Sequence, residues 1–249
     1  MKRFGLALIF PLLMLGFWQY AAVSGFLSPA YFPAPSRTLE ALASSIVTGS
    51  LWSPFAATVL RMLEGWLVAC LLGICFGAII GLSQRARDYL NPTLEFLRPF
   101  PASAVIPAAI LIFGLSNTMT IWVIAFGSLW SVLLGTLHGF SAIEPRLREV
   151  ALVLEMRPFA YLRKIALPAA LPDIFTGARI SFSIALILAV VVEMQAAQPG
   201  LGQNILLAQR MFRSHELYAG IVVLGLFGLI MSWVLDGIER RLLAWKSSH

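Results

Sequence analysis

The longest uncharged run in the chain lies between Arg98 and Glu144, with no Asp, Glu, Lys or Arg among the residues that separate them. As one helix, at about 1.5 Å per residue, this run would be roughly twice as long as the hydrocarbon core of a bilayer is thick. The run must therefore fold back on itself within a membrane. Gly, Ser and Asn interrupt the apolar pattern at residues 113–120, which places the turn there and predicts spans at 102–113 and 119–139.

The composition supports a membrane protein. Hydrophobic residues make up 59% of the chain and charged residues 12%, and the mean hydropathy is +0.84. Soluble domains carry about 25% charged residues, so this chain has too little polar surface to cover a globule in water. Its net charge of +6 then concerns the side of the membrane that the basic residues face, and nucleic acid is not an expected partner.

Four further apolar segments are long enough to cross a bilayer, at residues 4–23, 57–82, 175–197 and 217–238. The first follows Lys2 and Arg3 and is too long for the core of a signal peptide, so we predict a retained span, with a cleaved signal as the alternative. The predicted fold class is all-α: a polytopic membrane protein with six transmembrane helices in a single domain over residues 1–249.

The basic residues predict the orientation, because short cytoplasmic loops are enriched in Lys and Arg. With the N-terminus in the cytoplasm, 14 basic residues fall inside and 4 fall outside. Both termini and residues 85–97 are then cytoplasmic. Arg98 is one of the 14 basic residues on the cytoplasmic side. The four outside residues are Arg37, Arg61, Arg210 and Arg213.

A charged segment at residues 143–172 joins the fourth and fifth predicted spans. It is much longer than a simple connector needs to be. Val150, Val153 and Leu154 form an apolar stripe at helical spacing, and Pro158 should break this first helix near Arg157.

A second short helix has its own stripe of Phe159, Leu162 and Ala166 and is expected to end at Leu167-Pro168 and Leu171-Pro172. The two stripes need a covering surface. A plain connector and a helix lying on the membrane are alternatives, but the pattern favours docking to a cytoplasmic partner.

This segment resembles the cytoplasmic coupling loop of the integral membrane subunits of bacterial ABC importers. The family pattern is E-A-A, three residues, Gly, nine residues and I-x-L-P, which the chain matches with Glu149, Val150, Ala151, Ile165, Leu167 and Pro168. The chain departs from it at Val150, and at Glu155, which stands where the family has the glycine that permits the turn. Pro158 is expected to take over part of that role.

Residues 91–116, 191–205 and the second predicted span are similar to permeases of the nitrate, sulfonate and taurine import group. The resemblance implies a type I ABC importer permease fold and no enzymatic activity. It also implies two permease copies around a pathway, two cytoplasmic ABC ATPase subunits and a periplasmic or lipid-anchored solute-binding protein, in the bacterial inner membrane. The ATPases would bind ATP and Mg, and this chain would hold no cofactor.

The solute that the resemblance implies is a small oxyanion such as nitrate, an aliphatic sulfonate or taurine. A pyrimidine vitamin precursor is the alternative within the same group. The candidate pathway residues are Arg61, Asn117, Glu193, Met194 and Gln195.

Ionisable residues within membrane spans point to function by default. Arg61 is expected either to pair with Glu64 three residues later, reaching towards the interface, or to attract anions at the outer mouth. Glu193 is expected either to line the pathway or to bond to the loop that contains Gly200 and Gly202. The three histidines are isolated, so no metal site is predicted.

Two other classes of membrane protein are alternatives to a permease. An ion-coupled secondary transporter needs acidic or histidine side chains in the middle of the membrane, and the centres of the predicted spans lack them. An intramembrane enzyme needs a nucleophile with its base, or a metal site, and the sequence has neither pattern.

Overall fold

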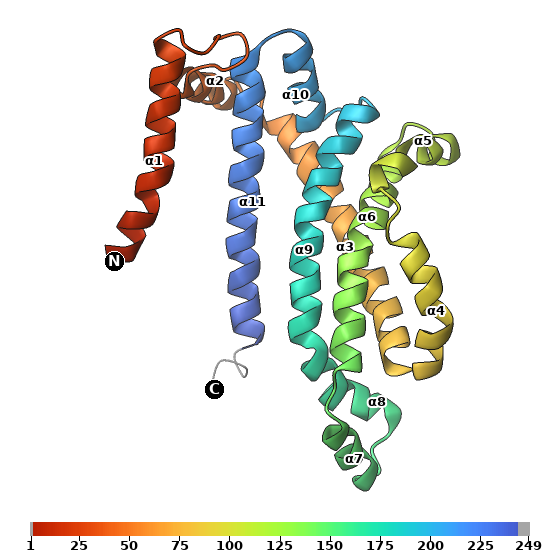
Figure 1. Ribbon diagram of the computed structural model, residues 1–249. Helices are drawn as coiled ribbons and strands as arrows, with labels where there is room; N and C mark the ends of the chain where they lie inside the picture. The colour runs from red at the N-terminus through yellow and green to blue at the C-terminus, as the bar shows by residue number, and fades with distance from the viewer. Residues whose placement is uncertain (1, 244–249) are drawn as a thin grey trace.

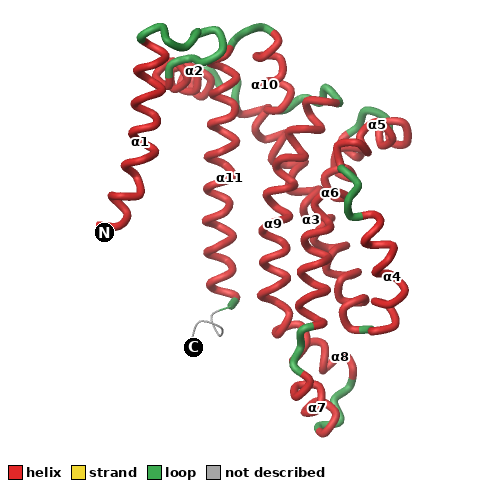
Figure 2. The backbone as a smooth tube through the Cα atoms, in the orientation of Figure 1, coloured by secondary structure: helices red, strands yellow, loops and turns green. Residues whose placement is uncertain are grey.

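The computed structural model describes residues 2–243, with side chains from residue 9 onwards. Its helices, joined by short loops (Figures 1 and 2), are α1 (Lys2–Val23), α2 (Pro35–Val47), α3 (Trp52–Leu82), α4 (Gln84–Leu97), α5 (Ala102–Phe113), α6 (Asn117–Ser141), α7 (Pro145–Val153), α8 (Pro158–Tyr161), α9 (Leu167–Gln195), α10 (Leu201–Arg210) and α11 (Ser214–Leu242). A π-helical turn, Leu162–Ala166, joins α8 to α9. The predicted all-α fold class is confirmed.

Glycines bring α3 and α6 into close contact. A Cβ atom added to Gly77 would lie 2.6 Å from Thr136 Cβ and 2.7 Å from the Leu133 carbonyl oxygen. Small residues at such positions let two helix backbones approach within a membrane. Gly65 lies similarly close to Ile124, Gly73 to Val132 and Gly81 to Phe140. Residue numbers rise together along both helices, so α3 and α6 run parallel.

Helix α9 packs on α6 in the opposite direction. Gly127 lies against Leu188, Gly135 against Gly177 and Gly139 against Ala170, so numbers rise along one helix as they fall along the other. We call α3, α6 and α9 the three-helix core. Met62, Ile124 and Phe182, one from each helix, are buried together in it.

Because α3 and α6 run parallel, the chain between them must return across the full length of the core. Helices α4 and α5 make this return, and their axes are bent by 91° at the break between them. Helix α5 has 12 residues, or about 18 Å, which is too short to cross a bilayer alone. Residues 102–113 are therefore helical as predicted but short, and residues 85–97, which the sequence assigned to the cytoplasmic side, are also helical. The bent pair is either one broken span or a re-entrant loop.

The count of six spans stays a prediction. Among the described residues, four helices are long and apolar enough to cross a membrane, namely α3, α6, the continuous helix Pro158–Gln195 and α11, and the bent pair α4–α5 makes a possible fifth. Residues Ile9–Val23 of α1 form a shorter apolar helix. The first predicted span begins at residue 4, and the side chains of its first residues lie outside the described part.

The second half of the charged segment differs from the prediction. Pro168 and Pro172 do not end a helix, since α8, the π-helical turn and α9 are continuous from Pro158 to Gln195. Pro168 lies in the first turn of α9, directly after the π-helical turn. The changed hydrogen-bond register of such a turn accommodates a residue that has no N–H group to donate. The predicted second short helix and the fifth span are thus one helix.

The two ends of the molecule are distinct in Figure 1: α7 and α8 form one end, here the loop end, and α2 and α10 form the other, here the cap end. Helix α11 buries only Ser214, Ala219 and Phe227. Nearer the loop end, the Arg179 guanidinium of α9 pairs with Asp236 of α11 at 2.7 Å and also with Glu239.

Candidate functional site

Residues 143–172, the coupling segment, turn sharply after α7. The Met156 N–H donates to the Ala151 carbonyl and the Glu155 N–H donates to the Leu152 carbonyl, both at 3.0 Å. This pair of bonds is the Schellman ending of a helix, whose left-handed residue is usually glycine. Here it is Glu155, with φ +46°. The turn therefore stays at the position of the family glycine, and the expectation that Pro158 takes over its role is wrong, since Pro158 begins α8.

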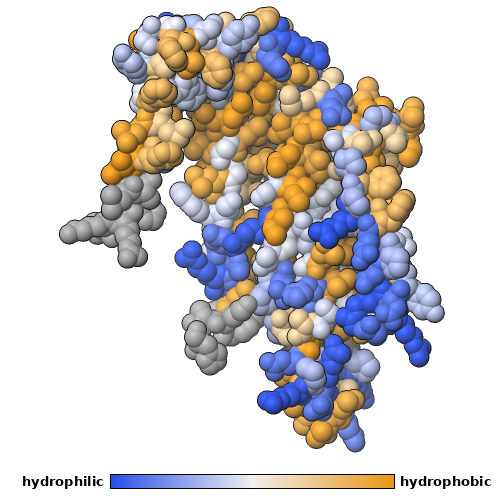
Figure 3. Space-filling model, viewed as in Figure 1, coloured by the Kyte–Doolittle hydropathy of each residue, from blue (hydrophilic) through white to orange (hydrophobic). Residues whose placement is uncertain are grey.

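Apolar side chains project into solvent around this turn. Leu152, Val153, Leu154 and Phe159 are 65–83% exposed; we call these four residues the coupling tip. Figure 3 shows hydrophobic surface at the loop end of the molecule, surrounded by hydrophilic residues. The coupling tip is an apolar surface that one chain leaves uncovered, as a docking site would be.

The other motif residues lie around the coupling tip at different depths. Ala151 is buried within the chain, at 7% exposure, so it packs inward and is not open to a partner. Glu149, Val150 and Leu167 are exposed, and Ile165 and Pro168 are half-buried. Phe140, Ile143, Ala166, Ala170 and Ile174 form a buried cluster against which Tyr161 and Leu162 pack. This cluster fixes the coupling segment to α6 and α9.

Three of the candidate pathway residues meet in a buried network near the cap end. Arg61 of α3 donates from Nη1 to Glu193 Oε1 of α9 at 2.7 Å, from Nε to Asn117 Oδ1 at 3.0 Å and from Nη2 to the Pro199 carbonyl at 2.6 Å. Glu193 is fully buried and Arg61 is 8% exposed. The expected pairing of Arg61 with Glu64 is not found, because Glu193, far away in sequence, takes that place.

The Glu193 carboxylate also holds the loop that leads to α10. Its Oε2 accepts from the Gly202 N–H and from the Thr58 hydroxyl, each at 2.9 Å, and Thr58 Oγ1 accepts from the Leu201 N–H at 2.9 Å. A Cβ atom at Gly200 would overlap the carboxylate. The network thus joins α3, α6, α9 and the start of α10.

The remaining candidates lie apart from this network. Met194 is half-buried and Gln195 is exposed, and neither is a hydrogen-bond partner of Glu193 or Arg61. All three guanidinium nitrogens of Arg61 already have acceptors. In this conformation the geometry suits a structural clamp between helices better than a site that holds a solute.

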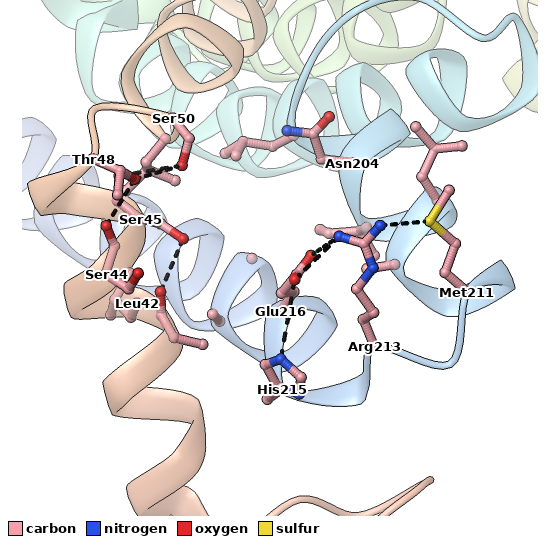
Figure 4. A pocket seen from close by; sticks show the side chains of 18 residues that line it. Leu42, Ser44, Ser45, Thr48, Ser50, Asn204, Met211, Arg213, His215 and Glu216 are labelled. Carbon is pink, nitrogen blue, oxygen red and sulfur yellow. Dashed lines mark hydrogen bonds and ion pairs between the residues drawn. The ribbon is translucent and has the colours of Figure 1, made fainter.

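A pocket of about 550 Å³ opens at the cap end between α2, α10 and α11. Figure 4 shows hydroxyl groups on one side of it, where Thr48 and Ser50 lie 3.1 Å apart. On the other side Arg213 pairs with Glu216 at 3.2 Å. Leu42, Leu201 and Ile205 are among the apolar residues that also line it, so the pocket presents a mixed surface.

Comparison with known proteins decides the family. Residues 73–244 match the family described as the binding-protein-dependent transport system inner membrane component. The chain belongs to this family. It is an ABC importer permease, the membrane component of a transport system and not an enzyme, and membership implies ATPase and solute-binding partners. The ion-coupled carrier and the intramembrane enzyme are thereby excluded.

Several relatives of this permease are named after a solute. A Bacillus subtilis (strain 168) protein named as the aliphatic sulfonates transport permease SsuC is 32% identical over 250 residues, covering 100% of this chain and 91% of that protein. The taurine transport system permease TauC of Escherichia coli (strain K12) is 30% identical, covering 93% and 86%. The bicarbonate transport system permease CmpB of Synechococcus elongatus (strain ATCC 33912 / PCC 7942 / FACHB-805) is 29% identical, covering 92% and 87%.

Solved structures confirm the permease fold. A chain of the MetNI methionine ABC transporter in an inward-facing conformation superposes with a TM-score of 0.66 at 16% identity, covering 75% of this chain and 93% of that chain. A chain of an amino acid ABC transporter solved with histidines gives a TM-score of 0.62 at 18% identity, covering 80% and 97%.

Sequence reasoning missed one set of residues because it treated residues 85–97 as a loop. Gln84, Asp88, Asn91, Glu95 and Arg98 recur along α4 at alternating intervals of four and three. That interval is a signal of one helical face, and it could have been read from the sequence. Glu95, an acidic residue of this helix, lies outside all six spans that the sequence predicted.

Proposed function

We propose that this permease forms half of the pathway by which an ABC importer carries a small oxyanion across the inner membrane, driven by ATP hydrolysis in partner subunits. The coupling tip carries this proposal, because it is an uncovered apolar surface fixed to α6 and α9. The names of the relatives, which include aliphatic sulfonates, taurine and bicarbonate, support a sulfonate or a similar anion as the solute.

The loop end would face the cytoplasm, where ATP is available to the ATPase that covers the coupling tip. The excess of basic residues on that side supports this orientation, in which both termini would lie inside. The cap end would then face the solute-binding protein, and the pocket between α2, α10 and α11 would be part of the surface that receives it.

Two copies of the permease would assemble with two ATPase subunits that bind ATP and Mg. One chain has a single coupling segment, whereas an ATPase pair that closes on ATP needs two. Closure would move both coupling tips, and each tip would carry α9 with it, because α8 and α9 form one continuous helix. ATP would thus favour one of two conformations of the pathway through its contacts with the ATPases.

Loss of apolar character at the coupling tip tests the proposal. The double change Leu152→Asp and Val153→Asp should prevent copurification of the ATPase and abolish ATP-dependent uptake of labelled taurine or ethanesulfonate, because charged groups cannot be covered by an apolar groove without a large desolvation cost. Phe212→Asp at the cap end, also at an exposed side chain, is the matched control and should leave the ATPase bound.

Normal uptake and normal ATPase binding by the double variant would refute docking at the coupling tip. A panel of competing solutes, with a pyrimidine vitamin precursor included, would identify the class of compound that is carried. The mass of the purified complex would separate two permease copies from one.

A further inference from the structure

A polar stripe runs along the whole of α4. Gln84, Asp88, Asn91, Glu95 and Arg98 lie on one face, and all five are exposed; we call these residues the α4 stripe. Helix α4 has no buried residue at all. Nothing in the part of the chain that the structure describes therefore covers this face.

The Arg98 end of the α4 stripe lies level with the middle of α6, a helix that is long and apolar enough to cross a membrane. A Cβ atom at Gly127 would lie 2.6 Å from Ala102 Cβ, so the chain just after the break is level with Gly127. Gly127 is the eleventh of the 25 residues of α6, about 15 Å from one end of a helix about 37 Å long. Arg98 is only four residues before Ala102, at the end of α4.

Charged side chains at this depth cannot face lipid without a large cost, and in membrane proteins they face water or a partner. Among the described residues, neither Glu95 nor Arg98 forms a side-chain hydrogen bond or a salt bridge with another residue of the chain. The exposed face of α3 is different, since Leu67, Leu71 and Ile79 are 58–66% exposed and suit lipid. The α4 stripe therefore suits an aqueous surface.

We propose that the α4 stripe lines the water-filled solute pathway and that Arg98 binds the anionic group of the solute near the middle of the membrane. This proposal rests on the import function proposed above. A guanidinium group stays charged and matches the geometry of an oxyanion with two parallel hydrogen bonds. Glu95, one turn nearer the loop end, would weaken this binding by repulsion, and conduction requires that a bound solute can leave.

Cysteine reactivity tests the aqueous surface directly. In the assembled transporter with Cys70→Ala and Cys75→Ala, Asn91→Cys should react with the anionic sulfonatoethyl and the cationic trimethylammonioethyl methanethiosulfonates in membrane vesicles of both orientations. Leu71→Cys, on the apolar face of α3, should not react. An Asn91→Cys protein as unreactive as Leu71→Cys would overturn the pathway assignment.

The charge of Arg98 should change the reaction rates of the charged reagents in the same assay. Arg98→Gln should slow the anionic reagent at Asn91→Cys by about tenfold, as expected for loss of electrostatic attraction, and leave the cationic reagent no slower. Arg85→Gln makes the same chemical change near the other end of α4 and off the α4 stripe, and should have little effect. Equal anionic rates with and without Arg98 would refute its role.

Uptake then tests solute binding. Arg98→Gln should raise the KM for ethanesulfonate by about tenfold, with ATPase copurification unchanged, and Arg98→Lys should restore part of the loss. An unchanged KM would contradict the proposal. Restoration of uptake by the charge swap Glu95→Arg with Arg98→Glu would also contradict it, because that result indicates a salt bridge between these two positions, within one copy or across two.

Failure of this inference is distinguishable from failure of the proposed function. A wild-type complex without ATP-driven uptake of any oxyanion would refute the import function, while the cysteine assay would still report whether the α4 stripe faces water. A wild-type complex that imports ethanesulfonate, with an Arg98→Gln variant that imports it equally well, would refute only the inference.

Discussion

The three-helix core and α4 differ in how their helix surfaces are covered. Both lie between the loop end and the cap end, but α3, α6 and α9 are in close contact at glycines, whereas α4 buries no residue. The core helices cover one another within one chain. The polar face of α4 has no cover among the described residues, and we propose that the water of the pathway covers it.

The charged pairs follow the same division. Arg61 and Glu193 are buried and each has several hydrogen-bond partners, while Glu95 and Arg98 are exposed and have no side-chain partner in the described chain. A buried pair with all its hydrogen bonds made is a structural element. An exposed pair at the depth proposed for Glu95 and Arg98 would indicate function.

The largest expected effect comes from breaking the buried pair. Glu193→Ala would leave the Arg61 guanidinium buried without its counter-charge, together with the unpaired Gly202 N–H. We expect a loss of about 3–5 kcal/mol in the free energy of unfolding, seen as a lower midpoint in thermal unfolding of the purified permease.

Two comparisons make this result specific. Gln195→Ala, at an exposed position two residues later, should leave the midpoint nearly unchanged. Arg61→Met combined with Glu193→Gln removes both charges but keeps an acceptor for Gly202, and it should recover most of the loss. Equal midpoints for Glu193→Ala and Gln195→Ala would show that the pair does not stabilise the core.

A smaller but still large effect is expected from the glycine contacts. Gly77→Leu would force a side chain into the Thr136 Cβ and the Leu133 carbonyl, at a cost of about 3 kcal/mol. Gly237→Leu on α11 is the matched control, since a Cβ atom there would meet nothing within 4 Å. Size-exclusion profiles should show aggregation for the first variant only, and similar profiles for the two would contradict the close packing of α3 on α6.

The smallest effect is a gain. Glu155 holds a left-handed backbone conformation that costs a side-chain-bearing residue about 1 kcal/mol. Glu155→Gly should therefore raise the free energy of unfolding by up to about 1 kcal/mol and preserve uptake. If Glu155 were instead in a regular helix, the same substitution would lower the free energy of unfolding by a similar amount. Pro158→Ala, which leaves the Schellman bonds intact, is the comparison, and a larger loss of uptake from Pro158→Ala than from Glu155→Gly would place the turn at the proline instead.

Local pattern predicted much of the fold. The apolar runs led to α3, α6 and α11 with small errors at their ends, and the motif spacing located the coupling segment. Predictions failed where a local rule depends on its neighbours. A proline normally ends a regular helix, but Pro168 follows a π-helical turn and the helix continues through it. A polar run normally indicates a loop, but residues 84–97 are helical because the chain must return along the core between α3 and α6.

The sequence by itself indicated that this chain lies in a membrane and belongs to a family of permeases, and it predicted a coupling segment at residues 143–172, because hydropathy and motif spacing are properties of neighbouring residues. Only the tertiary structure decided that Arg61 pairs with Glu193, which is 132 residues away, and that α4 must return between two parallel helices. These outcomes depend on which helix backbones can approach closely, and that is settled by glycines that meet across distant parts of the chain.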